Sequence, residues 1–385
     1  MYQRYRTRGN PDKSHFKTPY RIHTFATMDS IPQPIRHLAN TLDRDALQRR
    51  LDSETFSRKT VSFYRYVYLD NPTQVRDQLY LQWEALGCLG RIYVAKEGIN
   101  AQMNVPEHQW DQFKTQLYAW PEFHNVPFKM AVEDDGKSFL KLQVKARPHI
   151  LADGLPLGSY DVSDVGRHLT AQEWNELMER PDAVVVDIRN HYESEIGHFE
   201  NALIPQAETF REELPEVLEM LQGKEEATVL LYCTGGIRCE KTSSFLKHYG
   251  FKNVNQLHGG IIDYARQIQE FGIGNKFHGK NFVFDERLGE SISDEVISQC
   301  HQCGSPADKH TNCTNTACNV LFIQCDHCKA TREGTCSSLC QEIVHLPEKE
   351  RLELQKQSAR EASGNAKRFA RKVLHGVAAP EKSSI

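Results

Sequence analysis

From the 385-residue sequence we predict a multidomain protein of the α+β and α/β classes, on the basis of three observations. Over residues 56–150, expected strands and helices are ordered as in an α+β sandwich. Over residues 165–275, almost wholly apolar strands alternate with helices, which is typical of a parallel α/β domain with strands buried on both faces. Residues 276–346 contain eight of the eleven cysteines, which indicates a small cysteine-rich module.

The first domain, residues 56–150, is predicted from hydrophobic periodicity and from β-branched and aromatic runs. We expect strands at 61–69, 91–95, 99–105, 128–133 and 139–147, and helices at 73–86 and 106–118. Their order begins β-α-β-β-α-β, which is that of a ferredoxin-like (acylphosphatase-like) sandwich. Because this fold serves many functions, it predicts none by itself.

The last of these strands is unusually basic. Lys141, Lys145 and Arg147 alternate with apolar residues, so the basic side chains share one face of the strand. One interpretation is the solvated face of a half-buried strand. The other is a stripe that follows the phosphates of a nucleic acid, which makes these three residues substrate-binding candidates.

The central domain, residues 165–275, contains a cysteine loop with a specific chemical pattern. An apolar strand ends at Cys233, so the thiol is expected at the carboxyl edge of the sheet. The loop runs from Cys233 to Arg238, and Gly235 and Gly236 free its backbone N–H groups to surround an anion at the start of the next helix. That environment favours the nucleophilic thiolate, and Arg238 adds positive charge. Cys239 either resolves a persulfide as a disulfide or packs under the helix, and we favour packing.

This loop resembles the active loop of the rhodanese family. Its Cys-x4-Arg spacing is one residue shorter than the Cys-x5-Arg loop of cysteine phosphatases, which surrounds a phosphate. The resemblance includes Val185–Asn190, Glu193, Gly197–Phe199 and Ala202. It implies that Asp187 and Arg189 support the active loop.

A closer resemblance covers residues 40 to 345. Six runs are similar to the bacterial rhodanese-domain tRNA uridine hydroxylases: Gly90–Tyr93, Ala95–Gln102, Asp134–Phe139, Arg189–Glu193, Tyr232–Lys241 and Gly279–Arg287. This resemblance implies oxygen-dependent hydroxylation of the wobble uridine of tRNA to 5-hydroxyuridine, with Cys233 as the essential cysteine. It also implies tRNA as a partner, molecular oxygen as co-substrate and an electron donor that the sequence does not identify. No flavin, nicotinamide or 2-His-1-carboxylate motif stands out.

Two other functions compete with hydroxylation. A persulfide loop taken alone predicts a sulfurtransferase that passes sulfane sulfur through Cys233. A non-catalytic binding module is the third interpretation, and the intact Cys233 and Arg238 argue against it.

The cysteine-rich module is predicted to bind zinc in a structural role. Its cysteines are Cys300, Cys303, Cys313, Cys318, Cys325, Cys328, Cys336 and Cys340. Two Cys-x2-Cys pairs and two looser pairs suit two tetrahedral Cys₄ sites. Alternate pairing joins Cys300, Cys303, Cys325 and Cys328 in one site and the other four in the second. The alternatives are sequential pairing of the cysteines, an iron–sulfur centre, or no metal at all. One of His301, His310 and His327 could also replace a cysteine as a ligand.

The overall composition and the two chain ends predict the setting and the terminal segments of the protein. The net charge of −4 gives no global attraction to nucleic acid, and no apolar run reaches the ~18 residues of a membrane span. Without a secretory signal, the cysteines favour metal binding and catalysis in a reducing cytoplasm over disulfides.

Residues 1–55 are expected to be a flexible extension. The basic start of this extension has three interpretations: a transit peptide, a disordered tail, or an over-long gene start that precedes the true initiator Met28. Residues 347–385 are expected to be a basic tail, either a frayed helix or a weak RNA contact.

Overall fold

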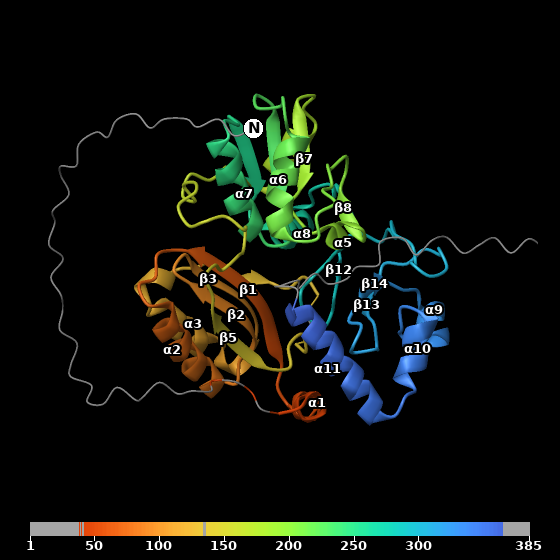
Figure 1. Ribbon diagram of the computed structural model, residues 1–385. Helices are drawn as coiled ribbons and strands as arrows, with labels where there is room; N and C mark the ends of the chain where they lie inside the picture. The colour runs from red at the N-terminus through yellow and green to blue at the C-terminus, as the bar shows by residue number, and fades with distance from the viewer. Residues whose placement is uncertain (1–37, 39, 41, 134–135, 365–385) are drawn as a thin grey trace, which may run out of the picture. The chain divides into compact units, whose positions relative to one another are not determined.

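Figure 1 shows a computed structural model of the chain, which describes residues 38, 40, 42–133 and 136–364. The predictions for the first 37 residues, including the role of Met28, lie outside the described residues. So do Asp134 and Asp135 of one matched run, and residues 365–385 of the expected basic tail. Side chains are described as far as residue 357.

The first domain is built on one five-stranded sheet with the order β4-β1-β3-β2-β5. Its strands are β1 (Arg58–Tyr66), β2 (Leu89–Ala95), β3 (Gly98–Pro106), β4 (Lys129–Met130) and β5 (Leu142–Ala146). Its helices are α2 (Pro72–Ala85) and α3 (Trp110–Tyr118), with the 3₁₀ turns η1 (Glu107–Gln109) and η2 (Pro121–Phe123). The first four strands pair antiparallel, and β5 joins β2 in parallel at one edge. The predicted ferredoxin-like sandwich is confirmed.

The two faces of this sheet differ in chemistry. Helices α2 and α3 cover one face (Figure 1), and they bury Trp83 and Phe113 against Phe63 of β1. Because side chains alternate along a strand, Tyr64 and Tyr66 point to the opposite face, where they are half-buried. The helix-free face is therefore polar and aromatic.

Two local predictions for this region are wrong. Residues 44–52 were expected to belong to a flexible extension, but they form helix α1 (Arg44–Asp52), whose N-terminus is capped by the side chain of Asp43. The spacing of Leu47 and Leu51 places both on one buried helix face. The strand expected at 128–133 is confined to Lys129–Met130, because only these two residues pair with β1.

The central domain has a parallel sheet with the order β6-β10-β9-β7, which confirms the predicted class. Its strands are β6 (Arg167–Leu169), β7 (Ala183–Asp187), β9 (Thr228–Tyr232) and β10 (Asn253–Leu257). Its helices are α4 (Ala171–Met178), α5 (His191–Ser194), α6 (Phe210–Met220), α7 (Ile237–His248) and α8 (Gly260–Phe271). Every residue of β9 is buried, so the strand that leads into Cys233 is fixed by packing on both faces.

The remaining elements lie outside the parallel sheet, and all except β8 follow it in the chain. Strand β8 (Gly197–Phe199) pairs with β11 (Phe277–Asn281), which pairs with β12 (Glu290–Ser291). A hairpin of β13 (His310–Asn312) and β14 (Leu321–Ile323) precedes α9 (Asp326–Thr331), α10 (Ser338–Val344) and α11 (Glu348–Gly364). Thus the described part of the expected basic tail is a helix. No helix in the described ranges combines the length and apolar character that a membrane crossing needs.

Candidate active site and metal centres

Cys233 lies in the loop between β9 and α7. The backbone N–H of Gly236 donates a hydrogen bond to its Sγ at 3.1 Å. Gly236 has φ +94°, a left-handed conformation that side chains disfavour, and an added Cβ there would lie 2.8 Å from the Tyr64 hydroxyl. The second glycine of the loop is therefore required by backbone conformation and by space.

The surroundings of Cys233 favour its thiolate. Burial by itself raises the pKa of this fully buried thiol, but several groups act in the opposite direction. A hydrogen bond from the Cys239 thiol, the positive charge of Arg238 and the backbone N–H groups of both residues lower the pKa of Cys233 to about 6. The thiol is thus largely ionised near neutral pH, as a nucleophile requires.

Arg238 is held by a carboxylate and does not stand alone beside the thiol. Its guanidinium forms a two-point ion pair with Glu193, at 2.5 Å and 2.9 Å, and also donates to Thr234. Glu193 is fully buried, and Arg238 is buried as well. Glu193, which appeared in the sequence only as part of a family match, therefore fixes the end of the active loop.

Asp187 and Arg189 form a second buried pair, behind the loop. Arg189 donates to both carboxylate oxygens of Asp187, at 2.8 Å and 2.6 Å, and to the carbonyl oxygen of Gly197. The hydroxyl of Tyr232, the residue before Cys233, donates to Asp187 at 2.7 Å. This geometry ties the ends of β7 and β9 together, so these residues act on the loop through Tyr232.

Cys239 packs in the core below the loop and is fully buried. Burial, the hydrogen bond to Cys233 and the charge of Cys233 all raise the pKa of Cys239 well above its usual value. It is therefore the protonated member of the pair.

The first domain supplies side chains to the same loop, which sequence reasoning missed. The Tyr64 hydroxyl donates to Glu240 at 3.0 Å, and that of Tyr66 donates to the carbonyl oxygen of Ile237 at 3.3 Å. An added Cβ at Gly235 would lie 3.7 Å from Cδ of Lys129. These residues are at least 100 positions away from Cys233 along the chain, so no local pattern could have linked them to it.

Glu213 of α6 is a buried acid that the sequence did not single out. It is fully buried, and within the described residues neither carboxylate oxygen has a hydrogen-bond partner. Burial raises its pKa well above the usual value; the charge of Arg238 opposes this, whereas Asp187, Glu193 and Cys233 add to it. This carboxyl group is therefore held in its neutral form near the thiolate.

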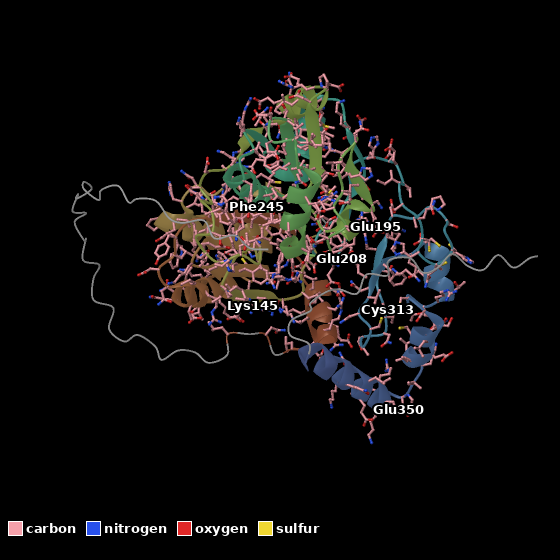
Figure 2. The ribbon with its side chains drawn as sticks, turned by 45° about the horizontal axis from the view of Figure 1, so that its top comes forward. Lys145, Glu195, Glu208, Phe245, Cys313 and Glu350 are labelled. Carbon is pink, nitrogen blue, oxygen red and sulfur yellow. The ribbon has the colours of Figure 1, made fainter. Side chains whose placement is uncertain are left out.

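The basic strand β5 lies at one edge of its sheet. Leu142 and Val144 are buried, while Lys141 and Arg147 are exposed, which confirms the predicted alternation. Lys145, labelled in Figure 2, lies between them and is partly buried. Burial lowers the pKa of Lys145 first, followed by the positive charges of Arg147, Arg91 and Lys141. Arg91 of β2 is thus a fourth member of the basic cluster.

The eight C-terminal cysteines are gathered in two groups of four. One group is Cys300, Cys303, Cys325 and Cys328, and the other is Cys313, Cys318, Cys336 and Cys340. Cys313, labelled in Figure 2, directly follows β13. Within each group, one sulfur from every residue lies within 4.8 Å of the others. The grouping is that of alternate pairing, and none of the three candidate histidines belongs to it.

The spacing of the sulfur atoms fits a tetrahedral metal site. Cys303 and Cys325 have their sulfurs 3.7 Å apart, and Cys318 and Cys336 have theirs 3.6 Å apart. Four thiolates at the usual zinc–sulfur distance of about 2.3 Å would be separated by about 3.8 Å. A disulfide needs about 2.0 Å, so these are free cysteines arranged as in a Cys₄ site.

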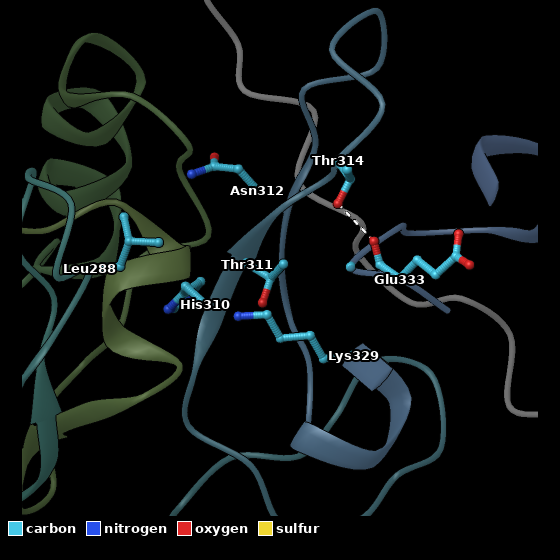
Figure 3. Close-up of a pocket in the computed structure, with 8 residues that line it drawn as sticks. Leu288, His310, Thr311, Asn312, Thr314, Lys329 and Glu333 are labelled. Carbon is cyan, nitrogen blue, oxygen red and sulfur yellow. Dashed lines mark hydrogen bonds between the residues drawn. The ribbon is translucent and has the colours of Figure 1, made fainter. Parts of the chain in front are cut away.

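A cavity of about 350 Å³ lies beside the β13–β14 hairpin (Figure 3). His310, Thr311 and Lys329 line it, and Thr314 donates to the carbonyl oxygen of Glu333 at its rim, at 2.8 Å. Cys233 is not among the residues that line this cavity.

Comparisons with known proteins cover nearly the whole chain. Three family models match: a UPF0176 acylphosphatase like domain at residues 58–150, a Rhodanese-like domain at 170–267 and a Rhodanase C-terminal region at 278–341. The tRNA uridine(34) hydroxylase of Leptospira interrogans is 56% identical over 83% of this chain and 88% of that protein. The tRNA uridine(34) hydroxylase of Yersinia pestis is 48% identical over 91% of this chain and 99% of that protein. The chain therefore belongs to the tRNA uridine(34) hydroxylase family.

Proposed function

We propose that this protein is an enzyme that hydroxylates the wobble uridine, position 34, of tRNA to 5-hydroxyuridine, with molecular oxygen as co-substrate. The observation that carries the proposal is the identity of 56% with a relative of that name, extending over 88% of the relative. The low pKa of Cys233, about 6, supports its assignment as the catalytic cysteine. A tRNA substrate and reduced cysteines favour a cytoplasmic setting.

The thiolate of Cys233 can take part in hydroxylation as a nucleophile. In this proposal, Sγ adds to C6 of uracil, and the C5=C6 electron pair moves toward C5 and O4. C5 then accepts an oxygen atom from the oxidant. Loss of the C5 proton and departure of the thiolate restore the ring. An electron donor and protons reduce the second atom of molecular oxygen to water.

The tRNA contact is proposed to use the basic cluster on β5 and the active loop. Lys145 lies on the edge strand β5, Lys141 directly precedes this strand and Arg147 directly follows it, while Leu142 and Val144 of its other face are buried. Positive side chains at such an edge suit the regularly spaced phosphates of an RNA strand. Gly235 and Gly236 of the active loop are the proposed substrate contacts beside Cys233.

The two cysteine groups are proposed to hold structural zinc. Four thiolates in each group leave no open position on the metal, so the ions would stabilise the C-terminal fold and take no part in the reaction. An iron–sulfur centre is the alternative that uses the same ligands.

The proposal is tested by nucleoside mass spectrometry of tRNA from a bacterial deletion strain that lacks any redundant pathway. Expression of this chain is expected to restore 5-hydroxyuridine and its derivatives in aerated cultures and not in anaerobic ones. If the 5-hydroxyuridine content of the deletion strain is the same with the chain as without it, the function is excluded. Restoration of 5-hydroxyuridine in anaerobic cultures would exclude molecular oxygen as the co-substrate, but not the hydroxylation itself.

A sulfurtransferase is the second candidate, because the intact Cys233–Arg238 loop lies in a Rhodanese-like domain match. Incubation of the purified protein with thiosulfate tests it by intact-protein mass spectrometry. Rapid formation and discharge of a Cys233 persulfide, together with unchanged tRNA hydroxylation in the cell-based assay, would favour this alternative.

A further inference from the structure

Lys129 is a buried lysine that the first domain directs toward the active loop. It belongs to β4 and pairs with Ser62 of β1, so its side chain shares the helix-free face of the sheet with Tyr64. Only 5% of Lys129 is exposed. Its Cδ lies 3.7 Å from the position of an added Cβ at Gly235, and β4 contacts α8 of the central domain.

The ammonium group of Lys129 has no carboxylate partner among the described residues. Its Nζ lies 4.4 Å from the centre of the Tyr64 ring, and no described carboxylate oxygen is within the 4.0 Å of an ion pair. A charge removed from water in this way needs a compensating charge nearby. Burial lowers the pKa of Lys129, whereas the charges of Asp263, Cys233 and Glu240 act to raise it.

The other charged groups around Cys233 are already engaged. Arg238 is neutralised by Glu193 in the two-point ion pair. Glu240 accepts hydrogen bonds from Tyr64, His168 and Gln256. Burial raises the pKa of Asp263, and the positive charge of Lys129 opposes this shift; burial raises the pKa of Glu213 well above its usual value. Lys129 is therefore a cation at this loop that forms no ion pair within the described part of the chain, and the charges of Asp263, Cys233 and Glu240 act on it from beyond ion-pair distance.

We propose that Lys129 is the counter-cation of the Cys233 thiolate, so that the first domain completes the electrostatic environment of the nucleophile. Lys129 is a positioning residue in this role, because it acts on the substrate through the state of Cys233. The Tyr64 ring holds the ammonium group over the loop. The thiol is consequently most acidic when the two domains are in contact.

The proposal rests on Cys233 being the nucleophile of the proposed function, but its test needs neither tRNA nor oxygen. The thiolate absorbance of the full-length protein is titrated with pH, and the absorbance of a matched Cys233→Ser protein is subtracted. The wild-type midpoint is expected near the pKa of about 6. In Lys129→Met the midpoint is expected to rise by about one unit, so the thiolate at pH 6 falls from about one half to about one tenth.

Further variants separate charge from folding. Lys129→Arg is expected to restore the low midpoint, since it keeps the charge. Tyr64→Phe keeps the ring and is expected to shift the midpoint less than Tyr64→Leu, which removes it. Lys59→Met is the matched control, because Lys59 also packs on an aromatic ring, that of Trp110, but pairs with Glu107 away from the loop.

The outcomes are distinct. A raised midpoint in Lys129→Met that Lys129→Arg reverses supports the proposal, whatever the fate of the hydroxylase assignment. An unchanged midpoint in folded Lys129→Met overturns it. A higher KM for tRNA with an unchanged thiol midpoint also overturns it and would make Lys129 a substrate contact.

Discussion

Cysteine serves two contrasting purposes in this chain. Cys233 lies apart from the cysteine-rich module, with a backbone N–H at 3.1 Å and a protonated Cys239 beside it. The eight C-terminal cysteines instead approach one another in fours, with neighbouring sulfurs about 3.7 Å apart. In the first region the protein's own dipoles and charges stabilise one sulfur anion. In the second, four thiolates in one group would need a metal ion to stabilise them.

The cysteine of the active loop is arranged for reactivity, whereas the eight C-terminal cysteines are arranged for stability. Buried charges around the Cys233 loop keep one thiolate available. The ion pairs Arg238–Glu193 and Arg189–Asp187 hold the loop in place. The cysteine groups close on themselves and offer no open position. Disturbing one region should therefore change chemistry, and disturbing the other should change folding.

The largest effect is expected from removing a metal ligand. Cys325→Ser should cost about one metal ion per chain and unfold the C-terminal region, because structural zinc sites contribute about 10–16 kcal/mol to folding. Metal analysis and thermal unfolding measure the loss. Cys336→Ser should release the other ion, and Cys88→Ser in the first domain should release none. Full metal content in Cys325→Ser, or well under one ion in the wild type, would contradict the two-site account.

The next effect concerns the ion pair that frames the active loop. Glu193→Gln leaves Arg238 buried and uncompensated, which should cost about 3–5 kcal/mol of unfolding free energy. It should also lower the pKa of Cys233 further, since Arg238 is no longer neutralised. Glu54→Gln breaks the comparably buried Arg58 pair and should destabilise without moving that pKa. An unchanged or higher pKa of Cys233 in Glu193→Gln would refute the electrostatic reading.

A smaller, pH-dependent effect is expected at Glu213. Burial raises its pKa in the folded state above the unfolded value, so its contribution to stability is complete below about pH 4.5 and is lost as the pH rises toward the folded pKa. Glu213→Gln does not titrate. Its stability relative to the wild type should therefore grow with pH, by at most about 1.4 kcal/mol per pH unit. Urea unfolding at several pH values measures this, and parallel curves would argue against a neutral buried Glu213.

The smallest effects are expected on the basic strand. Lys141→Met, Lys145→Met and Arg147→Met should each weaken tRNA binding a few-fold and reduce the salt dependence of binding by about 0.7–0.9 per lost phosphate contact. Lys59→Met, on β1 of the same sheet, provides the control. If the salt dependence is unchanged in all three variants, β5 is only a solvated edge.

The sequence predicted the fold where local patterns were strong. The apolar runs of β7 and β9 and the alternation of β5 identified buried and half-buried strands. The spacing of the cysteines offered the observed alternate grouping, with sequential pairing as the other possibility. Helix α1 was missed because its apolar positions are only Leu47 and Leu51 among charged neighbours. The short β4 was overextended, since pairing with β1, and not local propensity, sets its length.

The candidate site was predictable only as far as its local loop. Cys233, its two glycines and Arg238 are adjacent in sequence, so their pattern is visible there. Tyr64 and Lys129 reach the loop from another domain, and the charges of Cys233 and Arg238 act on Glu213 of a separate helix. Such contacts depend on the packing of distant elements, which neither spacing nor periodicity encodes.

The most direct test of the central claim, that Cys233 carries out tRNA hydroxylation, is the 5-hydroxyuridine content of tRNA in a complemented deletion strain. Wild-type protein and Cys88→Ala should restore the modified nucleoside. Cys233→Ala, expressed and folded to the same level, should leave it at the background of the empty strain. Restoration of 5-hydroxyuridine by Cys233→Ala would contradict the account.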